Sequence, residues 1–148
     1  MRFPIEVHNK FLPFPGFSWM TWLVFCFTRK DKSVHLTGTA RYHELIHVVS
    51  QCELSILFAI ILLPIAIHFS FAWWAWVLTI LGILFAGWIC YGISNAIEFF
   101  CPPFGKSYYY TCWETEAYNH EGDPGYLRRR IPIWGSLKHI PNRLVRHK

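Results

Sequence analysis

The pattern of apolar and polar positions divides the chain into a long apolar middle and two charged ends. Residues 54–97 contain no Lys, Arg, Asp or Glu. Leu54–Ile67 and Phe71–Ile93 are almost wholly apolar and are separated by His68-Phe69-Ser70. Spanning a bilayer takes about 20 apolar residues, and the first helix is expected to begin upstream, near Ala40. We therefore predict two helices of about 28 residues each, or about 42 Å, paired as a transmembrane hairpin.

The segment on the N-terminal side of this hairpin is apolar but short. Phe17–Thr28 is rich in aromatic and β-branched residues and stops at Arg29-Lys30-Asp31-Lys32. About 12 residues are too few for a span, so the segment is either a strand or membrane-inserted at the interface. The charged turn precedes Ser33–Thr37, which we expect to return as the second strand of a small hairpin.

On the C-terminal side, a break is predicted at Cys101–Gly105, and a short helix at Cys112–Glu121 that ends at Gly122-Asp123-Pro124-Gly125. The basic tail after Tyr126 is expected to lie at the membrane surface. The predicted fold is a single domain, residues 1–148: a mainly α membrane protein with a two-helix hairpin, a small N-terminal strand or hairpin, and a short C-terminal helix.

Composition and charge support the membrane interpretation. The chain is 53% hydrophobic and only 16% charged, against about 25% charged in ordinary soluble domains, which argues against disorder and against an ordinary soluble enzyme. The net charge of +5 comes from basic residues that frame the apolar block, a membrane pattern rather than a nucleic-acid-binding one. The positive-inside rule then puts both termini in the cytoplasm.

Five scattered Cys without a CxxC pair indicate neither a disulfide framework nor a cysteine zinc site.

The strongest chemical pattern lies at the start of the first predicted helix. His43-Glu44-Leu45-Ile46-His47 matches HExxH, in which histidines at i and i+4 project from one helix face. Both imidazoles can then reach one Zn²⁺ at about 2.0–2.1 Å. Glu44 lies about 100° round the helix, where it can take a proton from zinc-bound water. We therefore predict that His43 and His47 bind zinc and that Glu44 is catalytic.

Two histidines leave a catalytic zinc site one protein ligand short, because such sites use three. The candidate ligands lie in the short C-terminal helix, where Glu114 and Tyr118 share one face and Glu116 points about 200° away from Glu114. We expect Glu114 to be the ligand and Tyr118 to hydrogen-bond the oxyanion or orient a ligand; Glu116 is the alternative ligand. Two crossings of the membrane would return the chain to the side on which His47 lies, so that Glu114 and His47 can share one site.

Three more residues are expected to surround the ligands rather than bind the metal. Gln51 lies one turn beyond His47 on the same face, Glu98 ends the second apolar helix, and Glu116 shares the helix of Glu114. Each also has an interpretation without a role at the site. Gln51 could be an amide on the helix surface, Glu98 a charge at the membrane interface, and Glu116 part of a solvated acidic helix.

These motifs resemble gluzincin-type metallopeptidases, which combine HExxH with a downstream glutamate on a second helix. The chain resembles more closely a group of small bacterial membrane proteins, familiar from Bacteroidetes, with the pattern HExIHxxQQ-x-E, an apolar helical pair and F/W-E-x-E-A-Y-x-N/H-E. The similarity covers about residues 17–140, and Ser50 departs from it where the first of the two Gln is common. The resemblance implies a zinc peptidase in which an N-terminal edge strand aligns the substrate. The matching residues are His43–His47, Gln51, Glu53, Glu98, Trp113–Tyr118 and Glu121.

Together these features predict a membrane-anchored, zinc-dependent metallopeptidase of the bacterial inner membrane, with its metal site in the cytoplasm. Its expected partners are a peptide or protein substrate and membrane lipid, with no nucleic acid, and a chain this short is compatible with a homo-oligomer. The alternative is a non-catalytic membrane scaffold or partner-binding protein with a structural or vestigial metal site.

Overall fold

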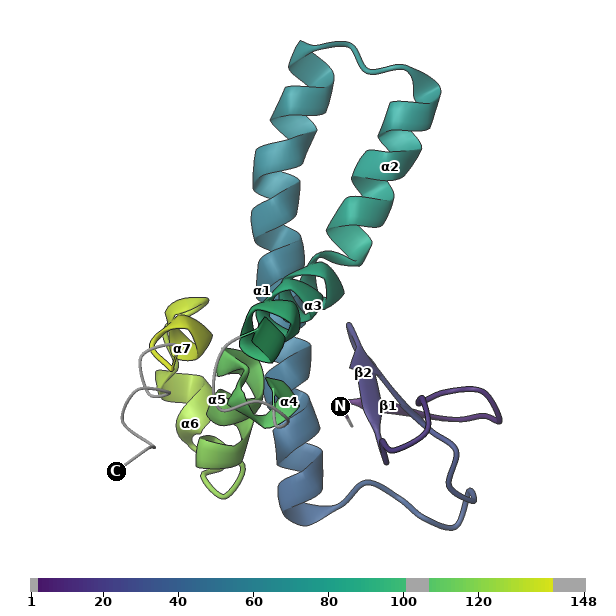
Figure 1. Ribbon diagram of the computed structural model, residues 1–148, viewed down its shortest axis with the longest axis vertical. Coiled ribbons are helices and arrows are strands. Elements are labelled where there is room, and N and C mark those ends of the chain that lie inside the picture. The colour runs from purple at the N-terminus through teal and green to yellow at the C-terminus, as the bar shows by residue number, and fades with distance from the viewer. Residues whose placement is uncertain (1–2, 101–106, 140–148) are drawn as a thin grey trace.

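The computed structural model describes residues 3–100 and 107–139. The predicted break at Cys101–Gly105 and the end of the basic tail lie outside these ranges. Within them the chain is mainly helical and has a small three-stranded sheet. The longest helix, α1, lies between the sheet on one side and the C-terminal helices on the other (Figure 1).

Helix α1, Gly38–His68, joins the HExxH pattern and the first apolar run in one element of 31 residues. It begins where Gly38 takes a φ of +57°, a conformation that glycine adopts without steric cost. Its length of about 46 Å and its composition are sufficient to cross a membrane. The predicted first helix is therefore present, with bounds close to those expected.

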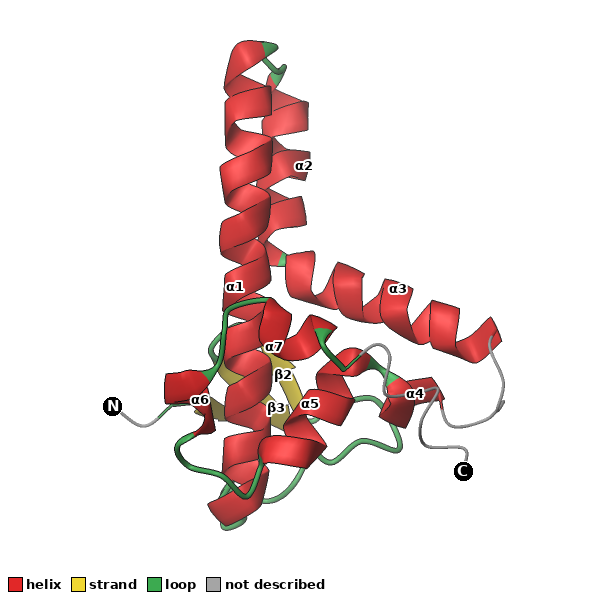
Figure 2. Cartoon of the chain, turned by 90° about the vertical axis from the view of Figure 1, so that its left-hand side faces the viewer, coloured by secondary structure: helices red, strands yellow, loops and turns green. Residues whose placement is uncertain are grey.

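The second apolar arm differs from the predicted unbroken helix. It forms α2, Trp73–Leu84, and α3, Ala86–Phe100, which are bent by 67° at Phe85. Helix α2 runs beside α1. Helix α3 begins against α1 and then turns away from it (Figure 2). At about 18 Å, α2 is too short to span a bilayer alone, so the arm could cross only as a bent pair and a hairpin of two unbroken spans is not present.

The bend at Phe85 has partners in the sheet and in α1. The Trp22 indole donates to the carbonyl of Leu84 at 3.2 Å and stacks on Phe85, with ring centroids 5.0 Å apart. Gly87, just beyond the bend, packs so closely on Gln51 of α1 that a Cβ would come within 2.5 Å of Gln51 Cγ. The bend thus satisfies a helix-terminal carbonyl and places α3 against α1.

The N-terminal segment forms a sheet of order β1-β3-β2, from Ile5–His8, Met20–Trp22 and Phe25–Thr28. Strands β2 and β3 are an antiparallel hairpin, and β1 pairs parallel with β3. The strand alternative for Phe17–Thr28 is therefore the one the structure adopts. The expectation of a returning strand at Ser33–Thr37 is wrong: this segment is not a strand, and its Leu36 side chain is buried. The β1 strand, earlier in the chain, takes the position beside β3.

Residues 107–139, the described part of the C-terminal region, form four short helices beside the N-terminal half of α1 (Figure 1). Helix α5 confirms the predicted short helix, and its Thr111 N-cap accepts the N–H of Glu114 at 3.3 Å, an arrangement that satisfies a free helix-terminal donor. Ala117 of α5, fully buried, packs against Ile46 of α1 and Tyr126. The bounds are Ser107–Tyr110 for α4, Cys112–His120 for α5, Tyr126–Arg129 for α6 and Trp134–Leu137 for α7.

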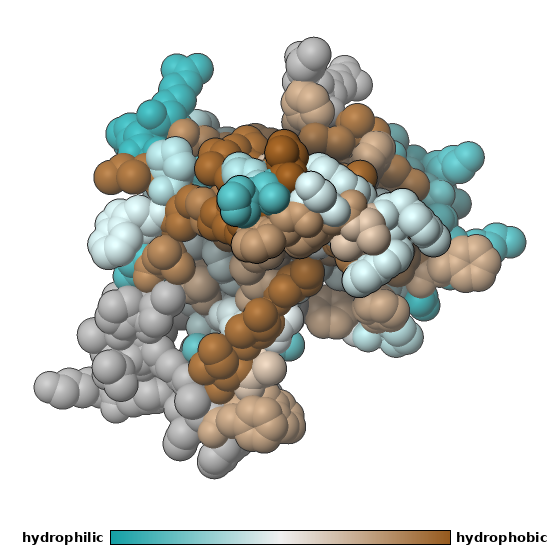
Figure 3. Space-filling model, turned by 90° about the horizontal axis from the view of Figure 1, so that it is seen from above, coloured by the Kyte–Doolittle hydropathy of each residue, from teal (hydrophilic) through white to brown (hydrophobic). Residues whose placement is uncertain are grey.

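The far end of α1 and α2 exposes large apolar side chains. Figure 3, which looks down on the molecule from this end, shows apolar surface over much of its centre and hydrophilic residues mainly at the margin. Monomeric soluble proteins rarely expose apolar patches of this extent. The exposed residues include Ile60, Ile61, Ile67, Phe69, Trp73, Trp74, Val77 and Leu78.

Candidate metal centre

Three side chains from α1 and α5 converge on one point. His43 Nε2 lies 3.2 Å from His47 Nε2 and 3.3 Å from Glu114 Oε2, and His47 Nε2 lies 3.3 Å from Glu114 Oε1. Glu114 is 2% exposed and His43 8%. The HExxH helix and the short helix thus bring together the two histidines and the glutamate that the spacing had singled out.

These distances fit a metal ion. Two ligand atoms at about 2.0–2.1 Å from a tetrahedral zinc ion lie about 3.3 Å from each other. The three separations at this site, from 3.2 to 3.3 Å, match that value. The donor set of two imidazoles and one carboxylate is also one that divalent transition metals bind.

The hydrogen bond of His43 Nδ1 leaves the lone pair of Nε2 directed at Glu114. His43 Nδ1 lies 2.9 Å from Glu121 Oε2, and because an ionised carboxylate has no hydrogen to donate, Nδ1 must carry the proton of this bond. In the neutral ring Nε2 is then an acceptor. Glu114 Oε2, 3.3 Å away, is buried and accepts no hydrogen bond of good geometry from the described residues. Two acceptors that face each other in a buried site are the arrangement that a cation satisfies.

The charge of Glu114 suits the same role. Burial disfavours the ionised form of this carboxyl, but the adjacent His47 outweighs it, so that the pKa of Glu114 lies below its usual value of 4.5. The hydroxyl of Tyr91, from α3, donates to Glu114 Oε1 at 3.1 Å. Glu114 is therefore an ionised carboxylate that α3, the helix beyond the bend, holds through Tyr91.

A cavity of about 270 Å³ opens beside the ligands. His47, Glu114 and Glu44 share its wall with aromatic residues of the N-terminal segment, such as Phe17 and Trp19. Glu44 Oε2 accepts a hydrogen bond from the Thr21 hydroxyl of β2. The glutamate of HExxH thus lies at the cavity next to the candidate ligands, where water and a substrate could enter.

Gln51 contacts the sheet rather than the candidate ligands. Its amide nitrogen donates to the carbonyl of Thr21 at 3.0 Å, and its oxygen accepts the N–H of Leu23 at 2.7 Å. The Trp88 indole of α3 donates to the same Thr21 carbonyl at 3.0 Å. Gln51 therefore holds the free edge of β2 against α1, a role that its helical position alone did not indicate.

The other predicted residues have different surroundings. Glu116 is fully buried on the opposite face of α5, where Arg130, Ser136 and Tyr126 hydrogen-bond it. Glu98 lies on α3 and is not one of the described residues that line the cavity. The structure thus gathers Glu114, not Glu116, with the two histidines.

Tyr118 packs on the candidate ligands from outside the cavity. Its ring meets that of His43 edge to face, with centroids 4.6 Å apart, and 46% of the residue is exposed. Burial, and then the charge of Glu114, raise the pKa of Tyr118 to about 12. The phenol therefore keeps its proton at neutral pH and can act as a donor.

Several residues that complete the site carry little or no signal in the sequence. Glu121 belongs to the pattern given above but has no predicted role, although it hydrogen-bonds His43. Tyr91, Thr21 and Trp88 belong to no predicted site. For Glu121 a signal was present, because it lies seven residues after Glu114, two helical turns along the same face. The other three come from distant segments and carry no local signal.

Comparison with models of known families, with curated proteins and with solved structures finds no match to this chain. The interpretation of the centre therefore depends on its own geometry: a buried group of His43, His47 and Glu114 that is close enough to bind a metal ion.

Proposed function

We propose that this chain is a membrane-bound, zinc-dependent metallopeptidase. The observation that carries the proposal is the convergence of His43 Nε2, His47 Nε2 and the Glu114 carboxylate, beside a cavity that Glu44 also lines. The two histidine nitrogens lie 3.2 Å apart, and each lies 3.3 Å from a different oxygen of Glu114. Three protein ligands with room for one more are typical of catalytic zinc, whereas structural zinc sites are closed by four. The similarity of these motifs to gluzincin-type peptidases agrees with this assignment.

The residues around the cavity have distinct parts in peptide hydrolysis. A zinc ion held by His43, His47 and Glu114 would supply Lewis acidity to a water molecule and to a peptide carbonyl. Glu44 accepts a proton from water in the cavity and returns it to the leaving amine. Tyr118 packs on His43 from outside the cavity, so its proposed role is to orient that ligand.

The sheet edge suggests how a peptide would be held. Met20 and Trp19 line the cavity together with Glu44, and β2 is the outer strand of the sheet. An extended peptide can pair with such an edge through backbone hydrogen bonds. Gln51 and Trp88 already occupy the Thr21 carbonyl, so the peptide would pair with the part of the edge that precedes Thr21.

The proposed location is the bacterial inner membrane. Helix α1 has the length and composition of a span, and the exposed apolar surface of the α1–α2 end would lie in lipid. The basic residues at both ends of the chain favour cytoplasmic termini by the positive-inside rule. A short domain of this kind is also compatible with a homo-oligomer.

Metal analysis of protein purified in detergent tests the proposal directly. The wild type is expected to contain zinc, and His47→Ala and Glu114→Ala are each expected to lose the ion of this centre. Glu44→Gln is the matched variant: it should retain the metal but lose cleavage of a fluorescence-quenched peptide library by more than about a hundredfold, the contribution of a general base. A zinc content of His47→Ala equal to that of the wild type, or full activity of Glu44→Gln, would contradict the proposal.

The alternative, a non-catalytic scaffold with a structural metal, has one observation in its favour. Gln51 and Trp88 fill hydrogen-bonding positions on the edge of β2, and the Thr21 hydroxyl occupies one oxygen of Glu44. In this arrangement the protein's own groups occupy the strand edge and the carboxylate. Glu44→Gln separates the two functions by its activity rather than its metal content, because the alternative predicts that this variant changes no cellular phenotype.

A further inference from the structure

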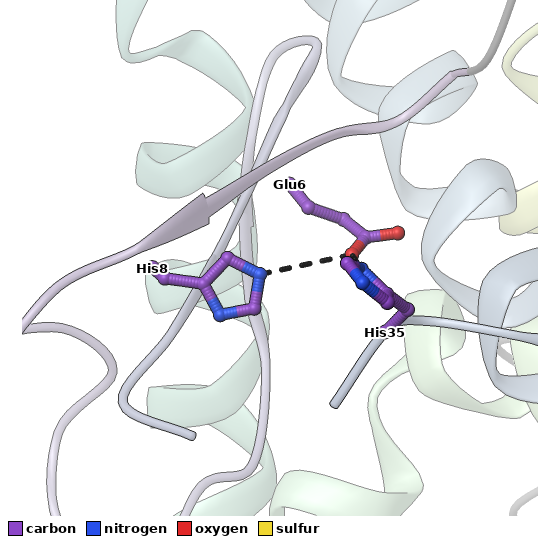
Figure 4. A group of neighbouring side chains, drawn as sticks. All are labelled: Glu6, His8 and His35. Atoms are coloured by element: carbon purple, nitrogen blue, oxygen red, sulfur yellow. Dashed lines mark hydrogen bonds and ion pairs between the residues drawn. The ribbon is translucent and has the colours of Figure 1, made fainter. Parts of the chain in front are cut away.

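A second group of potential metal ligands lies on the other side of α1, in the N-terminal segment. Glu6 and His8 project from β1, and His35 comes from the segment that leads into α1 (Figure 4). His35 Nδ1 is 3.0 Å from Glu6 Oε2, His8 Nε2 is 3.8 Å from the same oxygen, and each of the three residues offers an atom within 4.8 Å of the others.

We propose that Glu6, His8 and His35 form a second binding site for a divalent transition-metal ion of the zinc type. Two imidazoles and one carboxylate suit such ions, whereas Mg²⁺ and Ca²⁺ prefer oxygen ligands. The site is independent of His43, His47 and Glu114, and it does not rest on the proposed peptidase function.

The hydrogen bonds of His8 prepare it to bind a metal. His8 Nδ1 lies 3.2 Å from the carbonyl oxygen of Lys30, and because a carbonyl only accepts, this contact requires the proton on Nδ1. The unprotonated Nε2 then faces Glu6. A metal-binding histidine almost always donates its other ring N–H to a carbonyl, a carboxylate or water, and His8 already does so.

Arg41 orients the carboxylate. Its guanidinium lies 3.4 Å from Glu6 Oε1, while Glu6 Oε2 faces both histidines. Arg41 also donates to the backbone carbonyls of Phe3 and Leu36 at 3.2 and 3.3 Å, which keeps it on the Oε1 side. Glu6 Oε1 is thus held by Arg41, and Oε2 is directed toward the two histidines, where a cation would lie.

Small movements bring the three atoms to coordinating distance. His35 Nδ1 donates to Glu6 Oε2 at 3.0 Å, close to the separation of about 3.3 Å between ligand atoms in a tetrahedral zinc site, and a bound ion would replace the proton of this hydrogen bond. The His35 side chain is 65% exposed, whereas those of Glu6 and His8 are 15% and 13% exposed. His35 can therefore rotate toward a site whose other two ligands are held, and solvent can complete the coordination.

An ion at this place would join parts of the chain that are far apart in sequence. It would link β1 to the segment before α1, next to the start of the helix that carries HExxH. The β2 strand of the same sheet contacts Glu44 through Thr21. The second ion would therefore fix the sheet relative to Glu44 and stabilise the cavity without taking part in chemistry.

Zinc stoichiometry and thermal unfolding test the proposal on the full chain in detergent. After equilibrium dialysis against Zn²⁺, His35→Ala is expected to bind one zinc fewer than the wild type, and His8→Gln is expected to do the same. His68→Ala, an exposed histidine at the far end of α1, is the matched control and should bind as much as the wild type. Zinc should also raise the melting temperature of His47→Ala, and this rise should vanish when His35→Ala is added.

The outcomes separate this site from the first one. If only the second site is real, the wild type binds one zinc that His35→Ala loses and His47→Ala keeps. Unchanged stoichiometry in His35→Ala would overturn the proposal and leave Glu6 as an ion-pair partner of Arg41 alone. Because His35 is mostly exposed, its substitution is not expected to unfold the protein, and the circular dichroism spectrum checks this.

Discussion

Gly87 of α3 lies directly against Gln51 of α1, so that a Cβ at position 87 would come within 2.5 Å of Gln51 Cγ and 3.1 Å of its Cα. Gln51 in turn holds the carbonyl of Thr21 and the N–H of Leu23. The absence of one side chain therefore lets α3 approach α1 just beyond the bend, and the same contact positions the edge of the sheet beside Glu44.

Gly87→Ala is therefore expected to lower stability, although alanine is normally the better helix former. The added methyl group has to displace Gln51 or separate the two helices, and such overpacking costs about 1–3 kcal/mol. Gly92→Ala is the matched control, because its Cβ would meet no described heavy atom within 4 Å. Thermal unfolding in detergent compares the two; a Gly87→Ala variant as stable as Gly92→Ala would contradict this packing.

A second prediction concerns the buried ion-pair network that fastens the C-terminal segment to α1 and α5. The side chain of Arg130 is 1% exposed and pairs with Glu116 of α5 and Glu53 of α1. Arg130→Ala would leave two carboxylates without their cation, and breaking a buried pair costs about 3–5 kcal/mol. Arg129→Ala, whose side chain is 70% exposed, should cost less than about 1 kcal/mol. Equal unfolding free energies for the two variants would show that the network is not needed for folding.

The extent to which the sequence predicts this fold depends on how local each feature is. Helices α1 and α5 follow from apolar runs and turn residues near their ends, and both are where they were expected. The HExxH spacing places His43 and His47 on one face because that geometry belongs to a single helix. The same geometry separates Glu114 from Glu116, because the two residues point in different directions from one helix, but only the structure shows that Glu114 faces the histidines.

The remaining features depend on contacts between distant segments. The bend at Phe85 depends on Trp22, which lies 62 residues from the Leu84 carbonyl it binds, and hydropathy alone predicts one continuous helix there. The pairing of β1 with β3 cannot be read from alternation in a strand of four residues. Nothing in the sequence next to Arg41 indicates a partner for its charge, and only the structure relates it to Glu6.

The ion-pair network of Arg130, Glu116 and Glu53 also predicts that the stability of the fold depends on pH. Burial raises the pKa of Glu116, but hydrogen bonds from Arg130, Ser136 and Tyr126 outweigh it and lower the pKa below the usual 4.5. A carboxyl whose folded pKa is lowered stabilises the fold above its unfolded pKa, and this contribution disappears as the pH falls through the folded value. Stability should therefore decrease below about pH 4.5.

Glu116→Gln isolates this contribution. It should lower the free energy of unfolding at pH 7 and flatten its decrease between pH 5 and pH 3, since Gln does not titrate. Unfolding measured across this range for both proteins gives the comparison. Parallel curves would mean that other carboxyl groups, such as Glu114, account for the acid sensitivity.

The last prediction concerns Glu121, which holds His43 from the side opposite the candidate metal. Its carboxylate lies 2.9 Å from His43 Nδ1, and a partner in this position fixes the ring and raises its basicity as a ligand. Glu121→Gln should weaken zinc binding at the first site about 10–100-fold, as measured by competition with a chromophoric chelator. Asp123→Asn is the matched control, because this nearby carboxylate pairs with the exposed Arg129 instead. If both variants bind zinc as tightly as the wild type, Glu121 only caps the end of α5, and the orientation of His43 is determined by its packing against Tyr118.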